Sequence, residues 1–308
     1  MMKDELRRAV DTVRTRARPT MAAPYVLAAR AASLPPHLAF RYMTPKEWYW
    51  LNLRGEDTFR SLRGYLPTMP PDEMQVRFTG ASGEATLHEA FEFYRMVSEA
   101  SSRSRPKVAM DFGCGWGRIT RFFIKDFEKH RLIGVDPLAE SIETCQATNS
   151  WADFQQINLS PPIDRPDSSV DLIFAFSVFS HLSEETHLQW LEEFARLLRP
   201  GGMLVVTTRK RRFIPECARI RSQEERTPVN TGAFVAFRDT EKYLAMYDAG
   251  EYCNDPVGGG PNLPPSTYGE TCIPLAYAVQ RWQPDFSVVK FIDDPARLNQ
   301  NVIVAKRA

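Results

Sequence analysis

The chain has 308 residues, of which 43% are hydrophobic and 25% charged, and its 39 basic and 38 acidic residues leave a net charge of +1. These values are typical of a soluble globular protein with one large domain or two small ones. Because no field of one sign surrounds it, the sequence disfavours nucleic acid and anionic membranes as partners. No apolar run reaches the length of a membrane span.

The five cysteines are scattered and form neither a C-x-x-C pair nor the spacing of a zinc site. We therefore predict no metal site. The N-terminus lacks the apolar core of a secretory signal, and together with the odd cysteine count this favours a reducing, cytoplasmic location.

Residues 1–83 differ in character from the rest and are predicted to form an N-terminal helical extension that contacts substrate or another subunit. Helices are plausible over 3–17 and 21–33, and prolines after residue 66 end any helix there. The aromatic cluster at 48–50, Trp-Tyr-Trp, is interpreted as a core between this extension and the remainder. Lining of an aromatic substrate pocket is the alternative.

From residue 84 onward, apolar patterns of helical and strand type alternate. Such βα alternation predicts a parallel sheet with helices on both faces. The expected helices are 84–99, 118–129, 139–150, 183–198 and 274–282, and the expected strands are 107–112, 131–135, 153–157, 170–176, 203–208, 286–292 and 301–306.

Two segments complete the expected domain of residues 84–308. Residues 209–270, rich in Arg, Tyr, Pro and Gly, interrupt the alternation and are predicted to be an inserted cap that contacts substrate. The last two strands are joined by a link too short for a crossover helix, so they should pair as an antiparallel hairpin. The fold class is thus α/β, a doubly wound seven-stranded, mostly parallel sheet with a C-terminal antiparallel hairpin.

A glycine-rich loop, Asp-Phe-Gly-Cys-Gly-Trp-Gly at 111–117, follows the first strand of this alternation and opens a helix. Glycines there let a ligand approach the backbone and leave N–H groups at a helix N-terminus. A dinucleotide fingerprint, G-x-G-x-x-G, would need glycine where the chain has Arg118.

Two polar residues follow the next strands. Asp136 ends the second strand, about 20 residues past the glycines, where a carboxylate can accept hydrogen bonds from ribose hydroxyls. Asn158 follows the third strand and can reach an adenine edge. The loop, Asp136 and Asn158 all lie at the carboxyl ends of parallel strands, where open α/β sheets bind ligands.

With these motifs the sequence resembles the class I S-adenosylmethionine-dependent methyltransferases. DFGCGWG is similar to the first motif of that family, LIGVDPL to its second-strand motif, and LLRPGGMLVVTT to its entry into the fifth strand. The resemblance covers roughly residues 84–209 and 271–306. It implies S-adenosylmethionine as the methyl donor and S-adenosylhomocysteine as the product.

The resemblance also implies roles for individual residues. The methionine part of the donor would lie against Asp111, Gly113, Cys114 and Gly115. Its ribose would bind Asp136, and its adenine would contact Pro137, Asn158 and Leu159. Phe176 and Ser177 would lie beside the donor, and residues 178–181 would face the acceptor.

His181 is the candidate catalytic residue, because a histidine near an acceptor hydroxyl is a good general base at neutral pH. The alternative is a local packing role ahead of the next helix. His88 and His187 are interpreted as ordinary helix-surface residues. Cys114 is not expected to act as a nucleophile, since the backbone is what matters in such a loop.

The insertion contains two further features, a set of tyrosines whose role stays open and a run of basic residues. Tyr243, Tyr247, Tyr252 and Tyr268 either cover the acceptor or belong to a lid without direct contacts. The basic run at 209–212, Arg-Lys-Arg-Arg, is interpreted as solvated rather than as a phosphate or nucleic-acid site.

The favoured function is methyl transfer to a small molecule. The N/D-P-P-Y/F motif of many amino-group methyltransferases is replaced by Ser-Val-Phe-Ser at 177–180, which favours O- or C-methylation over N-methylation. Two alternatives stay open: a non-catalytic methyltransferase-like binding or scaffold protein, and an NAD(P)-dependent oxidoreductase. Neither the acceptor nor the oligomeric state is legible in the sequence, because function on a common fold lives in the site.

Overall fold

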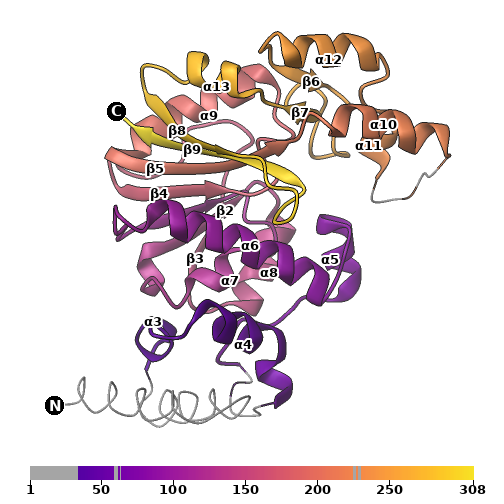
Figure 1. The fold of residues 1–308 in the computed structure, drawn as a ribbon. Coiled ribbons are helices and arrows are strands. Elements are labelled where there is room, and N and C mark those ends of the chain that lie inside the picture. The colour runs from indigo at the N-terminus through magenta and orange to yellow at the C-terminus, as the bar shows by residue number, and fades with distance from the viewer. Residues whose placement is uncertain (1–33, 59–61, 63, 225–226, 228–229) are drawn as a thin grey trace.

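The structure is a computed structural model that describes residues 34–58, 62, 64–224, 227 and 230–308. The helices expected over 3–17 and 21–33 lie outside these residues. Within them, a seven-stranded sheet is covered by helices on both faces (Figure 1).

The sheet has the strand order β3-β2-β1-β4-β5-β9-β8, in which β9 alone runs antiparallel to its neighbours. This confirms the predicted doubly wound sheet and its C-terminal hairpin. Its strands are β1 (Ala109–Phe112), β2 (Leu132–Asp136), β3 (Asp153–Gln156), β4 (Val170–Ala175), β5 (Leu198–Arg209), β8 (Phe286–Ile292) and β9 (Gln300–Arg307).

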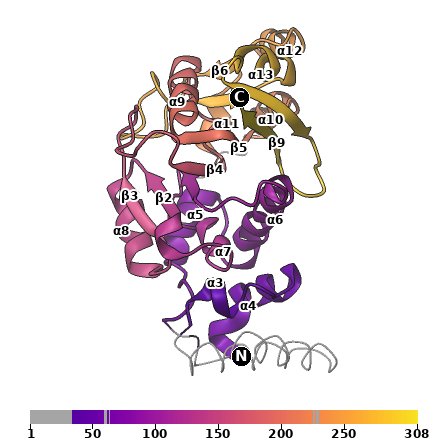
Figure 2. The same cartoon turned by 90° about the vertical axis from the view of Figure 1, so that its left-hand side faces the viewer.

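Alternate residues of each central strand enter different hydrophobic cores, as the two-residue period of a strand requires. On β1, Ala109 packs in the core beneath α6 (Glu84–Ser101) and α7 (Thr120–Phe123). Met110 packs in the other core, with α9 (Glu184–Leu197) and α13 (Leu275–Arg281). Figure 2 shows these two helix layers on opposite sides of the sheet. The sheet edge also carries η2 (Lys129–Arg131) and α8 (Ala139–Thr148).

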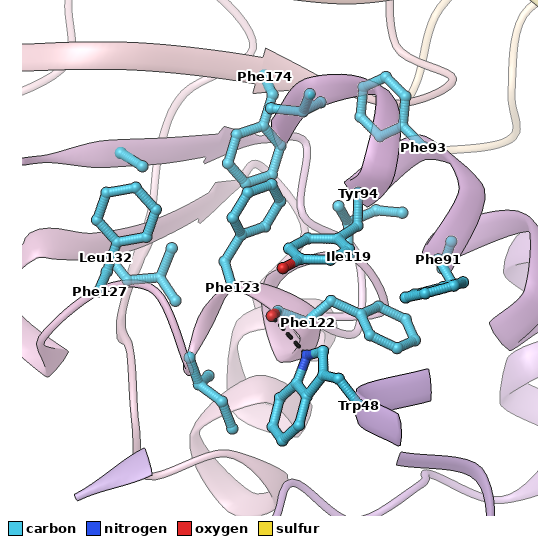
Figure 3. Packing of buried hydrophobic residues seen from close by; sticks show 14 of the residues in the cluster. Trp48, Phe91, Phe93, Tyr94, Ile119, Phe122, Phe123, Phe127, Leu132 and Phe174 are labelled. Carbon is cyan, nitrogen blue, oxygen red and sulfur yellow. Dashed lines mark hydrogen bonds between the residues drawn. The ribbon is translucent and has the colours of Figure 1, made fainter. Parts of the chain in front are cut away.

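The described part of the N-terminal extension packs directly on the first of these cores. It contains α3 (Pro36–Ala39), α4 (Pro45–Thr58) and α5 (Asp72–Thr79). Trp48 is fully buried, and its Nε1 donates a hydrogen bond to the carbonyl oxygen of Phe122 at 2.9 Å (Figure 3). The core interpretation of this tryptophan is therefore correct, and Tyr49 and Trp50 pack against the same cluster.

The helix predicted after the glycine loop is largely wrong. Only Thr120–Phe123 are helical, instead of 118–129, and the neighbouring residues form turns. Hydrogen bonds of the i→i−3 and i→i−4 kinds alternate here, as in Phe122 to Ile119 and Arg121 to Gly117. Aromatic and β-branched residues have low helix propensity, and burial of nearly every side chain in this stretch sets the path of the chain instead.

The fifth strand begins earlier than expected. The segment Arg-Pro-Gly-Gly at 199–202 was predicted to separate helix and strand, yet β5 runs from Leu198 to Arg209, with Gly201 at φ 79°. The other predicted elements occur with ends that differ by a few residues. The cap contains two strands that were not predicted.

The cap follows β5 and lies beyond the carboxyl ends of the parallel strands, at the same end of the sheet as α5 (Figure 1). Its helices and strands are α10 (Phe213–Ser222), α11 (Thr231–Val235), α12 (Thr240–Asp248), β6 (Cys253–Asp255) and β7 (Glu270–Cys272). A small core of its own holds it together, with Phe237 fully buried at its centre.

Candidate functional site

A cavity of about 230 Å³ opens at the carboxyl ends of the parallel strands. The glycine loop, the turns after β2, β3 and β4, the end of α5 and the cap all contribute to its walls. Its lining residues include Gly113, Cys114, Gly115, Asp136, Pro137, Asn158, Leu159, Phe176, Ser177 and His181. The structure thus brings together ten of the eleven residues that the sequence singled out.

The glycine loop adopts a conformation that only glycine takes readily. Gly113, Gly115 and Gly117 have φ values of 70°, 52° and 81°. The N–H groups of Gly113 and Cys114 both donate to the carbonyl oxygen of Val135, at 2.8 and 3.0 Å, which ties the loop to β2. At Gly115 an added Cβ would meet only the Phe78 ring, at 3.8 Å, so this side of the loop is open.

Asp136 braces the loop and also faces the cavity. One carboxylate oxygen accepts the N–H of Gly115 and the other that of Leu138, each at 2.9 Å. Burial raises the pKa of this carboxyl, and the two backbone hydrogen bonds oppose that shift. A carboxylate has about four acceptor sites, so two remain for hydroxyl donors of a ligand.

Asp111 is the one predicted residue that does not line the cavity. It is 1% exposed and lies beneath the loop, where it accepts a hydrogen bond from the Thr120 hydroxyl at 2.5 Å. Burial raises the pKa of this carboxyl to about 7. The structure therefore supports a role for Asp111 in holding the turn into α7 rather than in touching a ligand.

The residues after β4 form the wall opposite the loop. Ser177 has φ 60°, and its N–H donates to the Thr207 hydroxyl at 2.7 Å, which fixes the sharp turn at the strand end. Phe176 lies under the guanidinium of Arg118, 4.9 Å from its carbon to the ring centroid. Cys114, on the loop itself, is buried with a raised pKa, so it stays a thiol rather than a nucleophilic thiolate.

His181 is held by the cap. Its Nδ1 lies 2.8 Å from the carbonyl oxygen of Gly269. A carbonyl only accepts, so the neutral ring carries its proton on Nδ1 and keeps a lone pair on Nε2. Nε2 has no hydrogen-bond partner among the described residues and is not sealed from the cavity. Burial lowers the pKa of this histidine, so the neutral form prevails at physiological pH.

The strand β7 and the residue before it are hydrogen-bonded to the segment that carries His181. Besides the ring contact, the N–H of Gly269 donates to the His181 carbonyl at 2.6 Å, and that of Thr271 donates to Ser180 at 2.8 Å. The Tyr268 ring stacks on the His181 ring, with centroids 4.6 Å apart and planes 5° from parallel. The cap therefore fixes the orientation of the candidate base.

The interpretation of the basic run at 209–212 as a solvated surface is wrong for half of it. Arg209 pairs with the buried Glu270 at 2.9 Å, and Glu270 lies 3.7 Å from His181 Nδ1. The Lys210 side chain is 3% exposed and pairs with Asp293 at 2.6 Å. Both cations fasten the cap to the sheet, a role that sequence spacing does not reveal because their acidic partners are distant in the chain.

His187 was predicted at the helix surface, and this is also wrong. It is fully buried, and its Nε2 accepts a hydrogen bond from Nε1 of Trp282 at 3.0 Å. Burial lowers its pKa to about 3. Trp282 at the end of α13 and Tyr252 of the cap cover this face of α9, and both come from segments distant in the chain.

Of the four cap tyrosines, only Tyr268 lines the cavity. Tyr252 is buried and donates to the Leu182 carbonyl at 3.0 Å, while Tyr243 packs on Phe237 inside the cap. Sequence reasoning missed several lining residues, and no local pattern marks them: Phe78, Thr79, Trp116, Arg118, Thr186, Trp190, Leu263 and Thr267.

Neither a metal site nor a membrane-spanning helix is found in the part of the chain that the structure describes. It contains no cluster of histidine, cysteine or carboxylate side chains suited to a metal ion. None of its helices combines the length and the apolarity needed to cross a bilayer.

Comparison with known protein families identifies the domain. Residues 109–202, which run from β1 into β5, match the family model described as "Methyltransferase domain". These residues therefore match a methyltransferase domain, in agreement with the class I S-adenosylmethionine-dependent methyltransferases that the sequence motifs resemble. The topology of the sheet and the position of the glycine loop agree with this assignment.

Curated relatives match part of the chain over part of their own length. A protein of Azoarcus sp. named "Trans-aconitate 2-methyltransferase" is 34% identical over 99 residues, which are 32% of this chain and 38% of the relative. A Mycolicibacterium smegmatis protein named "Probable S-adenosylmethionine-dependent methyltransferase" is 29% identical over 148 residues, 46% of this chain and 56% of the relative. The chain thus spans about half or less of the length of these relatives.

Solved structures resemble the domain more distantly. One, an S-adenosylmethionine-dependent methyltransferase from Methanosarcina mazei, has 17% sequence identity and a TM-score of 0.44, and the match covers 66% of this chain and 92% of that one. This score is too low to add to the argument.

Proposed function

We propose that the chain transfers the methyl group of S-adenosylmethionine to an oxygen or carbon nucleophile of a small molecule. The observation that carries this proposal is that one cavity holds the glycine loop, the Asp136 carboxylate and an accessible nitrogen of His181. A scaffold protein would need the loop and Asp136 only to bind the donor. The accessible nitrogen favours an enzyme.

The residues present fit the donor. The open side of Gly115 leaves room for the methionine part, and Asp136 keeps acceptor capacity for the ribose hydroxyls. Asn158, with Pro137 and Leu159 beside it, lines the same cavity at the side where the adenine would lie. When bound, the donor supplies a methyl group that its sulfonium already activates.

With the donor already activated, the protein mainly has to orient the acceptor and receive a proton. Positioning alone can contribute roughly 7–11 kcal/mol in favourable intramolecular cases. His181 is neutral at physiological pH, it lines the cavity, and its Nδ1 contact leaves the lone pair on Nε2. It therefore takes the proton of an acceptor hydroxyl as the oxygen becomes nucleophilic.

The acceptor does not follow from the relatives. Several are named trans-aconitate 2-methyltransferases, but the match to the family model ends at residue 202, before the cap. Tyr268 and the residues that hold His181 belong to this cap, so the acceptor side is where the chain departs from what was matched. An O- or C-methyltransferase is favoured because Ser177 and its neighbours replace the motif of many amino-group methyltransferases.

Two further assignments belong to the same proposal. The described part of the N-terminal extension contributes to the fold and to the cavity, as Trp48 and Phe78 show, which supports a contact between the extension and substrate. A reducing, cytoplasmic setting is supported by five cysteines that are all free thiols.

The test is a transfer assay with methyl-labelled S-adenosylmethionine and a small-molecule extract, followed by identification of the labelled product. We expect a methyl ether, ester or C-methyl product from the wild-type protein and at least about a hundredfold less from His181→Ala. A labelled methylamine would overturn the O- or C-assignment. Donor that binds but is never consumed, with any extract, would favour the scaffold alternative.

A further inference from the structure

Charge on the cavity wall constrains which acceptors the cavity can hold. Of the described residues that line it, only Arg118 and Asp136 carry a formal charge at neutral pH. The lowered pKa of His181 leaves that ring neutral. Both oxygens of Asp136 already accept backbone hydrogen bonds.

Arg118, the single cation among the described lining residues, is already paired with a carboxylate of the protein. Its Nη1 lies 2.8 Å from a carboxylate oxygen of Glu89 and donates to the Thr86 carbonyl at 3.1 Å. The side chain is 9% exposed and lies over the Phe176 ring. An acceptor carboxylate would therefore compete with Glu89 for this guanidinium.

Two neighbouring arginines that do not line the cavity are also in ion pairs. Arg209, at the end of β5, is held by Glu270, the carboxylate beside His181. Arg77, next to the lining residue Phe78, pairs with Glu140. Moving an anion from water into such a cavity without a free counter-charge is unfavourable by several kcal/mol, so polycarboxylates and phosphates are poor occupants.

Several aromatic rings line the cavity among aliphatic side chains. Tyr268 stacks on His181 in a parallel arrangement, which presents a flat surface beside the accessible Nε2 atom. Gly259 makes room for this ring, because a Cβ there would lie 2.7 Å from Tyr268. Trp116 and Phe78 line the cavity from the loop and from α5. Flat apolar walls with one polar group are suited to planar apolar ligands.

We propose that the acceptor is an uncharged aromatic alcohol that lies against these rings and points its hydroxyl at His181. This rests on the proposed methyl transfer and deepens it. The acceptor oxygen forms a bond to the methyl carbon while the carbon–sulfur bond breaks and its electron pair returns to sulfur. The hydroxyl proton goes to Nε2 of His181, so the products are an aryl methyl ether and S-adenosylhomocysteine.

The test compares two probes of nearly equal shape, 2-naphthol and 2-naphthoate, by NMR titration at pH 7 with saturating S-adenosylhomocysteine. We expect the neutral naphthol to bind at least about tenfold more tightly, because the carboxylate finds no free counter-charge. Equal or tighter binding of naphthoate overturns the proposal. So does failure of both probes to bind at millimolar concentration while S-adenosylhomocysteine binds.

Matched variants separate the ring contact from general loosening of the cap. Tyr268→Ala should weaken naphthol binding at least about fivefold, because it removes both the apolar ring surface and the aromatic contact with the ligand, while Tyr268→Phe retains it. Tyr243→Ala, inside the cap and away from the cavity, should leave it unchanged. An equal loss in Tyr243→Ala would contradict the assigned contact.

Two further titrations separate failure of this proposal from failure of the methyl transfer on which it rests. In the first, S-adenosylhomocysteine is added alone, and absence of binding overturns the proposed methyl transfer. In the second, naphthol and naphthoate are added without S-adenosylhomocysteine. The naphthol and naphthoate comparison then still decides whether the cavity prefers neutral aromatic molecules.

Discussion

Gly113 and Val178 approach so closely that a Cβ atom on Gly113 would lie 2.3 Å from Cγ2 of Val178. The glycine loop and the turn after β4 therefore fit against each other through the missing side chain. This contact joins the first and fourth strands of the sheet at the mouth of the cavity, and it explains the glycine in structural terms.

Gly113→Ala should lower the free energy of unfolding by about 2–4 kcal/mol, from roughly 1 kcal/mol of left-handed strain and about 1–3 kcal/mol of overpacking. Gly64→Ala is the matched control, because Gly64 has φ 70°, as Gly113 does, and open space around it. It should cost about 1 kcal/mol. Chemical denaturation measures both, and Val178→Ala should recover part of the loss only in the Gly113 variant. Equal costs would contradict the contact.

The protonation of His181 should depend on Glu270. Glu270 raises the pKa of His181, whereas burial, the larger effect, and Arg209 lower it. In Glu270→Gln the pKa of His181 should therefore fall further below 6.5, as followed by NMR of the ring protons. A higher pKa in the variant, or none below 6.5 in the wild type, would show that the pair is misassigned.

Removal of His181 should separate chemistry from donor binding. His181→Ala is expected to lower kcat by about 10²–10⁴-fold, the usual contribution of a general base, with unchanged affinity for S-adenosylhomocysteine. In the wild type the rate should rise with pH through the lowered pKa of His181 and be level at neutral pH. His130→Ala, an exposed histidine paired with Asp153, serves as the control and should keep full activity. Equal activity of the two variants would remove His181 from the mechanism.

His187 should make stability depend on pH. Its pKa is about 3 in the folded protein against 6.5 unfolded. The unfolded chain therefore binds the proton first, so this contribution is complete above pH 6.5 and is lost as the pH falls toward 3. The difference corresponds to something on the order of 5 kcal/mol. His187→Gln should have a flatter stability profile than the wild type between these pH values, and an unchanged slope would argue against a buried neutral ring.

Trp48 should be needed for the stability of the whole domain rather than of the extension alone. Trp48→Ala removes a fully buried ring and leaves the Phe122 carbonyl without its donor, so we expect a loss of about 3–5 kcal/mol in one cooperative transition. Tyr42→Ala, at an exposed side chain of the same region, should change stability little. Two separate transitions would instead indicate an independent N-terminal unit.

Much of the fold was predictable because strands buried on both faces leave a continuous apolar signature. Val170–Ala175 is such a strand, and the short link before Gln300 allowed only an antiparallel return. The helix after the glycine loop was mispredicted because burial of Phe122 and Phe123 from several sides overrides local periodicity.

The donor side of the cavity was predictable from local motifs, since Gly113–Gly115 and Asp136 sit at strand ends that the topology brings together. The acceptor side was not, because Phe78, Tyr268 and the Gly269 carbonyl meet His181 only through tertiary packing of distant segments. The exposure of His187 was mispredicted for the same reason. The helical pattern shows on which face of α9 it lies, but not that Trp282, distant in the chain, covers this face.

The most direct test of the central claim is calorimetric titration with S-adenosylhomocysteine of the wild-type protein, Asp136→Asn and the exposed control Glu143→Ala. We predict micromolar binding by the wild type and the control, and a loss of at least about tenfold in Asp136→Asn, because one carboxylate oxygen becomes an amide donor. No binding by the wild type, or equal binding by Asp136→Asn, would contradict the assignment of this cavity to the methyl donor.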